Sequence, residues 1–377
     1  MKKTRKYLLI IIVLVFCSFV GDTNRSSDKD PDFIHATYSV GSRLKSKYSI
    51  DKSDFRNFQF VYLMAGPKWQ SKDFDLSQKE INRKYVQQHQ YKISEKDGIA
   101  LEPYLIKKVH ADDCKVLVSF PGSEFVEIAT DNSRREKFAN MMAEFVSRYN
   151  YDGVELDWEH TVDLHHHYLF MKDIRTALNM AEKKLNKKLH LTTALHSFHK
   201  YTKEQADAVS KQVDFINIMT YDIGGGIWGH AATHNTPLQL MKNVLKNWEV
   251  FDPQKLCIGL ATYGFYYKGI APGEKTEQPL KNYGRYMDYN ELPPLLEKGW
   301  TEEYDAQESM SYFFSPDRKE FATMDNHRSL KAKMEWVFSQ KFRGVFWWEF
   351  HTDFQISEDG KGTHALMDYV TGLINKK

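Results

Sequence analysis

The chain has 377 residues, of which 42% are hydrophobic, so it can bury a large core and fits one α/β barrel as a single domain. Its formal net charge of +2 gives no electrostatic argument for nucleic-acid binding, which we therefore exclude as a function. Aromatic residues make up 14% of the chain, and although most will pack in the core, exposed rings suit the apolar faces of sugars.

The N-terminal stretch 1–32 reads as an export segment followed by a polar tether. A basic start at 2–6 precedes an apolar run at 7–20, which is short for a membrane-spanning helix and the right length for the core of a signal peptide. Cys17, at the end of this run, resembles a bacterial lipoprotein attachment site. Lipidation with membrane attachment, simple cleavage and a retained anchor are all open, and each predicts that 33–377 is exported to the periplasm, the cell surface or the medium.

The elements then alternate along the chain. We predict β-strands at 33–40, 58–65, 115–120, 152–159, 189–195, 213–221, 256–265 and 344–350. We predict helices at 101–109, 131–150, 164–185, 203–211, 238–248 and 330–338. Such alternation implies a parallel sheet, and this number of repeats favours a closed (β/α)8 TIM barrel, an α/β fold. The stretch 266–320 contains prolines and many charges and interrupts the alternation of strands and helices. It predicts a small insertion between strands 7 and 8.

Cys114 and Cys257 each lie at the start of a predicted apolar strand. An exported protein can form disulfides, but their positions predict two buried free thiols. No Cys/His spacing indicates zinc, so we expect no metal and no cofactor.

The stretch 152–159 reads Asp-Gly-Val-Glu-Leu-Asp-Trp-Glu. Successive side chains on a strand point to opposite faces, so Glu155, Asp157 and Glu159 share one face, with neighbours roughly 6.6 Å apart along the strand. Crowded carboxylates are costly to bury ionised and tend to share protons. Alone, the pattern also fits an edge strand with a solvated acidic face.

Other strand ends carry polar or aromatic groups, and active sites of such barrels lie at the C-terminal ends of the strands. These groups are Ser119, Pro121 and Gly122 at the end of the third strand, Met219, Tyr221 and Asp222 at the end of the sixth, and Trp347, Trp348 and Glu349 on the last. The context therefore favours a catalytic role for the acidic strand.

In this order, the motifs resemble those of glycoside hydrolase family 18, the family of chitinases and endo-β-N-acetylglucosaminidases. The acidic strand resembles the signature Asp-Gly-x-Asp-x-Asp-x-Glu, and 219–222 matches Met-x-Tyr-Asp. The stretches 321–333 and 344–349 are similar to the family's last strand and the segment before it, so the resemblance runs from about residue 33 to the C-terminus. Two positions depart from the pattern: Glu155 replaces the usual Asp, which would crowd the strand interior, and Pro121 replaces the usual Gly.

The resemblance implies a substrate-assisted, retaining mechanism. Glu159 would protonate the leaving glycosidic oxygen, and a neighbouring carboxylate with partial burial would keep it protonated. The substrate's 2-acetamido oxygen would attack the anomeric carbon, while Asp157 orients the acetamide N–H and the Tyr221 hydroxyl holds its other side.

The resemblance also implies a set of substrate-binding residues. Trp348, rather than Trp347, would be the floor under the reacting sugar, and Asp222 would bind sugar hydroxyls. Met219 belongs to the same strand end, and Glu155 would tune Asp157 from behind. Outside the motif, 165–167 is a run of three histidines that we interpret as a solvated turn. Trp69 and Trp228 fit either outer sugar platforms or ordinary loop packing.

The first functional hypothesis is an exported, monomeric hydrolase of β-1,4 bonds next to N-acetylglucosamine, with chitin oligosaccharides as substrate. The alternatives are an endo-β-N-acetylglucosaminidase acting on N-glycans and a non-catalytic sugar-binding protein on the same fold. A further alternative is a glycosidase with a carboxylate nucleophile such as Glu349, which would have to lie about 5–5.5 Å from Glu159.

Overall fold

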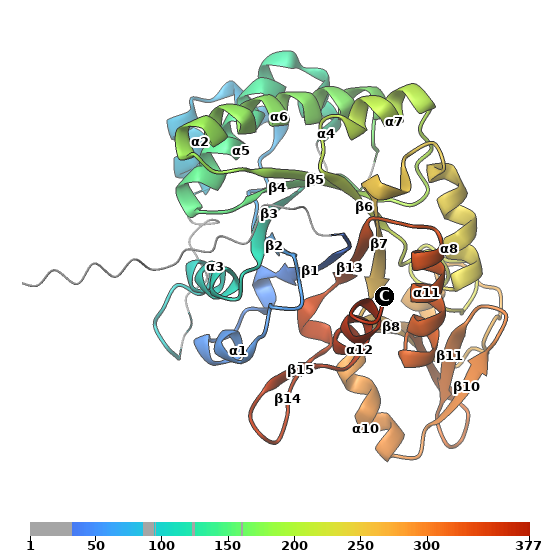
Figure 1. Ribbon diagram of the computed structural model, residues 1–377. Coiled ribbons are helices and arrows are strands. Elements are labelled where there is room, and N and C mark those ends of the chain that lie inside the picture. The colour runs from blue at the N-terminus through green and yellow to red at the C-terminus, as the bar shows by residue number, and fades with distance from the viewer. Residues whose placement is uncertain (1–31, 86–93, 95, 123–124, 160) are drawn as a thin grey trace, which may run out of the picture. The chain divides into compact units, whose positions relative to one another are not determined.

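The computed structural model describes residues 32–85, 94, 96–122, 125–159 and 161–377, and the predicted export segment with Cys17 lies outside these residues. Eight parallel strands close into a barrel in the order β1-β13-β7-β6-β5-β4-β3-β2 (Figure 1). Their bounds are β1 Ile34–Val40, β2 Phe60–Met64, β3 Lys115–Pro121, β4 Gly153–Asp157, β5 His190–His196, β6 Phe215–Met219, β7 Leu256–Ala261 and β13 Gly344–Trp348. The predicted TIM barrel is confirmed.

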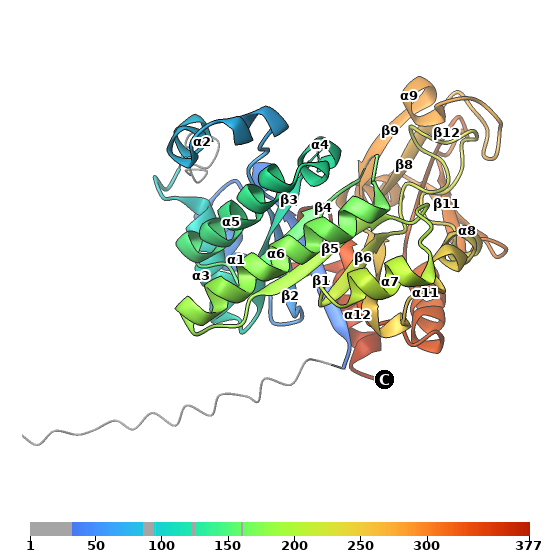
Figure 2. The same cartoon turned by 90° about the horizontal axis from the view of Figure 1, so that it is seen from above.

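Helices lie around the outside of these strands (Figure 1). They are α1 Lys47–Lys52, α2 Gln78–Tyr85, α3 Leu101–Ala111, α4 Phe125–Thr130, α5 Asn132–Tyr149, α6 Leu164–Leu185, α7 Lys203–Ser210, α8 Leu238–Leu245, α11 His327–Ser339 and α12 Ala365–Ile374. The long helices α5 and α6 run side by side over the strands in both views (Figures 1 and 2). No helix in the described part of the chain has the length and apolar character needed to cross a membrane.

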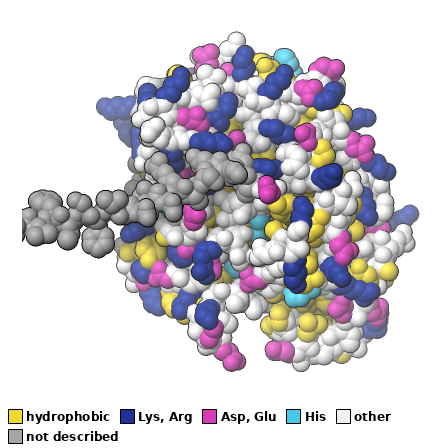
Figure 3. Space-filling model, viewed as in Figure 1, with side chains coloured by type: hydrophobic (Ala, Val, Ile, Leu, Met, Phe, Trp, Pro, Cys, Tyr) yellow, Lys and Arg dark blue, Asp and Glu magenta, His cyan; other side chains and the backbone are white. Residues whose placement is uncertain are grey.

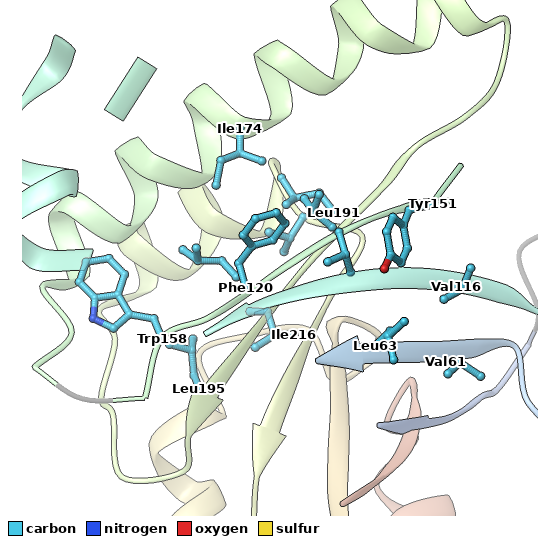
Figure 4. Packing of buried hydrophobic residues seen from close by; sticks show 14 of the residues in the cluster. Val61, Leu63, Val116, Phe120, Tyr151, Trp158, Ile174, Leu191, Leu195 and Ile216 are labelled. Atoms are coloured by element: carbon cyan, nitrogen blue, oxygen red, sulfur yellow. The ribbon is translucent and has the colours of Figure 1, made fainter. Parts of the chain in front are cut away.

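The main core lies between the strands and this helical layer. Figure 4 shows Ile174 projecting from α6 toward the strands, with Leu191 of β5 and Ile216 of β6 in the same cluster. All three are fully buried, and full burial of such a side chain contributes about 1.5–3 kcal/mol. Because this layer takes the outward-facing residues of each strand, the alternate residues are left to line the barrel interior.

The cysteine prediction is confirmed, since Cys114 and Cys257 are both buried and free. The interpretation of the three histidines as a solvated turn is wrong for His167. His165 is exposed, but His167 is fully buried in the first turn of α6. Its Nε2 lies 3.1 Å from the Thr193 hydroxyl, and its Nδ1 lies 3.2 Å from the Tyr201 hydroxyl. The helix therefore turns one of three consecutive histidines into the core.

A five-stranded antiparallel sheet, in the order β10-β11-β12-β8-β9, lies between β7 and β13 in the chain. Its strands are β8 Tyr263–Lys268, β9 Gly284–Asp288, β10 Thr301–Asp305, β11 Met310–Phe314 and β12 Glu320–Met324, and it carries helices α9 Pro279–Tyr283 and α10 Leu292–Glu297. We call residues 263–324 the insertion. Its sheet and α9 lie together on one side of the barrel (Figure 2).

The insertion starts earlier than the sequence pattern indicates. The strand predicted at 256–265 is divided at Thr262 into β7 and β8. Thr262 donates its N–H to the Trp348 carbonyl at 3.0 Å and its hydroxyl to the Glu349 carbonyl at 2.7 Å. The apolar pattern continues through this break, so the sequence carries no local signal for it.

Candidate active site

The acidic strand β4 places its three carboxylates at increasing height in the barrel. Glu155 and Asp157 face the interior and are buried, whereas Glu159 lies two residues beyond the strand and its side chain is 41% exposed. The alternate residues Val154, Leu156 and Trp158 pack in the outer core, as the strand period requires. Glu159 is therefore the carboxylate of this strand that reaches the barrel mouth.

Glu155 is held by donors from three other strands. The Tyr38 hydroxyl of β1 donates to Oε2 at 2.5 Å, and the Asn217 amide of β6 donates to Oε1 at 2.8 Å. The Thr192 hydroxyl of β5 donates to Oε1 at 3.3 Å. Burial raises the pKa of Glu155 to about 7, and these hydrogen bonds oppose that shift. Because Glu155 is fully buried, its influence on a sugar would have to pass through Asp157.

Asp157 is paired with Glu159 rather than with Glu155. Its pKa is raised well above the usual range by burial, by the charges of Glu159 and Glu155, and by a hydrogen bond to Glu159. Its Oδ1 is buried and, within the described residues, accepts no hydrogen bond. Two carboxyl groups in this arrangement are stabilised by sharing a proton. The free oxygen is available to an N–H donor.

Two further groups from the end of β6 face the acidic pair. Burial and the charges of Asp157, Glu159 and Asp222 raise the pKa of Tyr221. Asp222 has a left-handed backbone, with φ of 55°, and its N–H donates to Asn235 Oδ1 at 2.6 Å. Burial raises the pKa of Asp222 to about 6, while the neighbouring Tyr263 hydroxyl lowers it and Glu159 raises it. The fold thus brings together four residues that the sequence predicts as functional.

The last barrel strand supplies an aromatic floor. Trp348 is half-buried, and its ring centroid lies 5.4 Å from that of Tyr38 and 6.5 Å from that of Tyr221. Trp347 points to the outer core, where its Nε1 donates to His35 Nε2 at 2.8 Å. Met219, also predicted in the site, is buried in the same cluster as Tyr221 and Trp348.

His196 is a site residue that the sequence analysis misses. It ends β5, and its Nε2 lies 4.0 Å from Glu159 Oε2. The strand period could have identified it, because Thr192 and Ala194 face the interior and His196 follows in the same alternation. Tyr263 is missed as well, since the sequence pattern assigns it to the interior of a barrel strand.

Three other candidates take different places. Trp69 is buried against Phe120 and Phe138, with centroid distances of 5.5 and 5.2 Å, so packing explains it. Trp228 is 68% exposed and remains a candidate platform. Pro121 ends β3 in register with Asp157, a strand-end position where a missing N–H is tolerated.

Glu349 is occupied by other partners. Its carboxylate lies 3.4 Å from Arg43 Nε and accepts the backbone N–H groups of Val40 and His351 at 3.4 and 3.2 Å. It therefore caps the short helix Phe350–Thr352, which argues against its use as a nucleophile.

Comparisons with known proteins agree with this geometry. The model of the glycosyl hydrolases family 18 matches residues 39–353. A probable chitinase 2 from Drosophila melanogaster is 27% identical over 268 residues, which is 61% of this chain and 53% of that protein. Chitinase A1 from Niallia circulans is 26% identical over 284 residues, which is 63% of this chain and 40% of that protein. The chain spans about half the length of these relatives.

Solved structures share the fold. An immunomodulatory chitinase from Trichuris suis has a TM-score of 0.71 at 20% identity and covers 91% of this chain and 100% of its own. A chitinase from Cycas revoluta in complex with allosamidin has a TM-score of 0.70 at 17% identity and covers 90% of this chain and 98% of its own. The range matched by the family model contains the acidic pair, Tyr221 and Trp348, and the chain belongs to the glycosyl hydrolases of family 18.

Proposed function

We propose that the protein is a chitinase-like hydrolase that cleaves β-1,4 bonds next to N-acetylglucosamine. The observation that carries this proposal is the pair of Glu159, partly exposed at the barrel mouth, and Asp157, buried and hydrogen-bonded to it. The curated relatives are chitinases, which supports chitin oligosaccharides as the substrate class.

In the first step, Glu159 gives its proton to the glycosidic oxygen, and the bond from that oxygen to the anomeric carbon breaks. The acetamido oxygen of the substrate bonds to the anomeric carbon from the opposite face and forms an oxazolinium ion. Asp157 accepts the acetamide N–H at its free oxygen and offsets the positive charge that develops. Tyr221 holds the acetamide from the other side, above the Trp348 floor.

In the second step, the Glu159 carboxylate takes a proton from water as the water oxygen bonds to the anomeric carbon. The bond from the acetamido oxygen to that carbon breaks, which restores the acetamide and the protonated Glu159. Two inversions at one carbon give net retention.

The substitution Glu159→Gln tests the proposal, because an amide cannot donate the proton. We expect chitin-oligosaccharide turnover to fall about 100- to 10,000-fold, the usual contribution of a general acid–base group. The exposed Glu204→Gln on α7 is a matched control and should leave turnover unchanged. Equal rates above background for wild type and Glu159→Gln would refute catalysis by Glu159. No turnover by either protein would favour the non-catalytic sugar-binding alternative.

Product analysis separates the two hydrolase hypotheses. Wild type is incubated in parallel with chitin oligosaccharides and with high-mannose and complex N-glycans. We expect release of chitin fragments with retained anomeric configuration, whereas cleavage of the N-glycans alone would assign the endo-β-N-acetylglucosaminidase activity. Allosamidin, the ligand of the Cycas relative, should inhibit the reaction by competing with substrate.

The remaining expectations belong to the same proposal. The barrel 33–377 acts as a monomeric catalytic unit after export, and lipid attachment at Cys17 is one of three outcomes for the export segment, beside simple cleavage and a retained anchor. Mass spectrometry of the mature N-terminus tests lipid attachment, because a lipidated chain would begin at Cys17.

A further inference from the structure

His196 brings a basic side chain to the acidic pair. It is the last residue of β5, and its Nε2 lies 4.0 Å from Oε2 of Glu159. That distance is too long for a hydrogen bond but lies within the range of an ion pair. The side chain of His196 is 24% exposed, so water and salt screen a charge on it only in part. His196 can therefore act on Glu159 through its charge.

The barrel backbone fixes the position of His196 from both sides. β5 lies between β4 and β6, and His196 is in register with Met219 of β6. On the other side, the N–H of Trp158 donates to the Ala194 carbonyl of β5 at 3.2 Å. Trp158 is the residue directly before Glu159, so the two strand ends that carry the histidine and the acid are joined by backbone hydrogen bonds.

The groups that face Glu159 from β4 and from the end of β6 are acidic or phenolic. Asp157 is hydrogen-bonded to Glu159, and the charge of Glu159 acts on Asp222 and Tyr221. Glu155 lies behind Asp157 on the same strand and acts on it by charge. A second negative charge among these groups is disfavoured unless a cation offsets it.

Two further histidines lie close to β5, but on its outer side. His167 of α6 bonds to the hydroxyl of Thr193, and the charge of His199 acts on His167. The N–H of His199 donates to the His196 carbonyl at 3.3 Å, so both residues belong to the same turn after β5. The fold thus separates His196, which faces the acids, from two histidines that do not contact them in the described part of the chain.

The first step of the proposed reaction creates negative charge at this place. Glu159 gives its proton to the glycosidic oxygen and becomes a carboxylate next to Asp157 and Asp222. An imidazolium at 4.0 Å favours that carboxylate over the protonated acid. The negative charge of the acidic pair in turn favours the protonated form of His196. One contact therefore makes Glu159 a stronger acid toward an oxygen that leaves poorly.

We propose that His196, as an imidazolium ion, is a positioning residue that stabilises the Glu159 carboxylate formed when the proton passes to the glycosidic oxygen. His196 keeps its own proton in both steps and makes no bond to the reacting atoms of the substrate. This inference rests on the proposed function, because it concerns the proton transfer from Glu159.

The experiment compares His196→Gln, which removes the charge but keeps a polar side chain, with His196→Lys, which keeps a positive charge. The matched control is His199→Gln, since His199 is a partly buried histidine of the same turn whose charge acts on His167. For each protein, kcat/KM is measured across the pH range on chitin oligosaccharides and on a 4-nitrophenyl glycoside of the N-acetylglucosamine disaccharide. The nitrophenolate leaves readily without a proton, so the aryl glycoside depends little on the strength of the acid.

For His196→Gln we expect kcat/KM on chitin oligosaccharides to fall up to about tenfold at the pH optimum, with a much smaller fall on the aryl glycoside. The pH above which activity is lost should rise by up to about one unit, because Glu159 holds its proton to higher pH without the cation. His196→Lys should recover part of the loss on oligosaccharides, and His199→Gln should behave as wild type on both substrates.

The two substrates and the pH profile distinguish a role of charge from a role in packing. Equal losses on both substrates with an unchanged pH profile would show that His196 acts through packing, which would overturn the inference. His196→Lys no more active on oligosaccharides than His196→Gln would also overturn it.

The same measurements separate failure of this inference from failure of the proposed function. Kinetics of His196→Gln identical to those of wild type, with Glu159→Gln inactive on oligosaccharides, would overturn the role of His196 and leave the proposed function intact. Absence of turnover by wild type on both substrates would overturn both proposals.

Discussion

At the scale of single residues, Glu155 shows how a departure from a family pattern is accommodated. Its longer side chain reaches donors on β1, β5 and β6, so the crowding expected from the sequence becomes a set of hydrogen bonds across the barrel. The sequence identifies the residue but cannot supply the three partners, because each lies on a strand distant in the chain.

Glu155 predicts a pH dependence of stability. Its pKa rises from 4.5 to about 7 on folding, so the folded state holds the proton more tightly than the unfolded state. The free energy of unfolding that this group contributes should therefore fall by up to about 3 kcal/mol as the pH rises from 4.5 through 7. Glu155→Gln removes the titration. The free energy of unfolding of the variant minus that of wild type should therefore be larger at pH 8 than at pH 5.

Denaturant titrations of both proteins at the two pH values measure this difference. The exposed Glu204→Gln serves as the control and should show no pH-dependent difference from wild type. The same difference between wild type and Glu155→Gln at both pH values would contradict a titrating Glu155.

At the scale of elements, a buried ion pair joins helix α11 to Asp325, the residue that follows the insertion. Lys333 Nζ lies 2.6 and 2.7 Å from the two carboxylate oxygens of Asp325 and 2.6 Å from the Thr236 hydroxyl. Both charged side chains are buried. Desolvation lowers the pKa of Lys333, and Asp325 opposes that shift.

Lys333→Met should cost about 3–5 kcal/mol in the free energy of unfolding, because it leaves the Asp325 charge buried and unpaired. The double variant Lys333→Met with Asp325→Leu should recover most of this loss, since both charges are then removed. Lys331→Met is the matched control on the same helix, since Lys331 is 63% exposed and should matter little. A loss of similar size in the single and double variants would show that the pair acts through packing alone.

The strands that the sequence predicts are those buried on both faces. Barrel strands such as β2 and β6 are continuous apolar runs, so their pattern indicates them directly. The strands of the insertion mix exposed and buried residues over short lengths, and β10 is largely exposed, so this stretch reads only as a charged excursion. Its order of strands depends on pairings that no local pattern encodes.

At the scale of the described molecule, positive and negative side chains are interspersed on the face shown in Figure 3, as a net charge of +2 over the chain would suggest. The proposed substrate, chitin oligosaccharide, carries no net charge, so electrostatic steering has nothing to act on. We expect kcat/KM to change little between low and physiological salt. A steep fall with added salt would indicate a charged substrate instead.

Thr262 has a practical consequence for remodelling the enzyme. It is the residue where the chain leaves the barrel, and it clasps the backbone on either side of the peptide that follows Trp348. Thr262 therefore joins the start of the insertion to the backbone beside Trp348. A chimera that replaces the insertion with that of another enzyme should be joined after Thr262 and before Asp325. Trp348 then keeps the backbone hydrogen bonds that hold it in place.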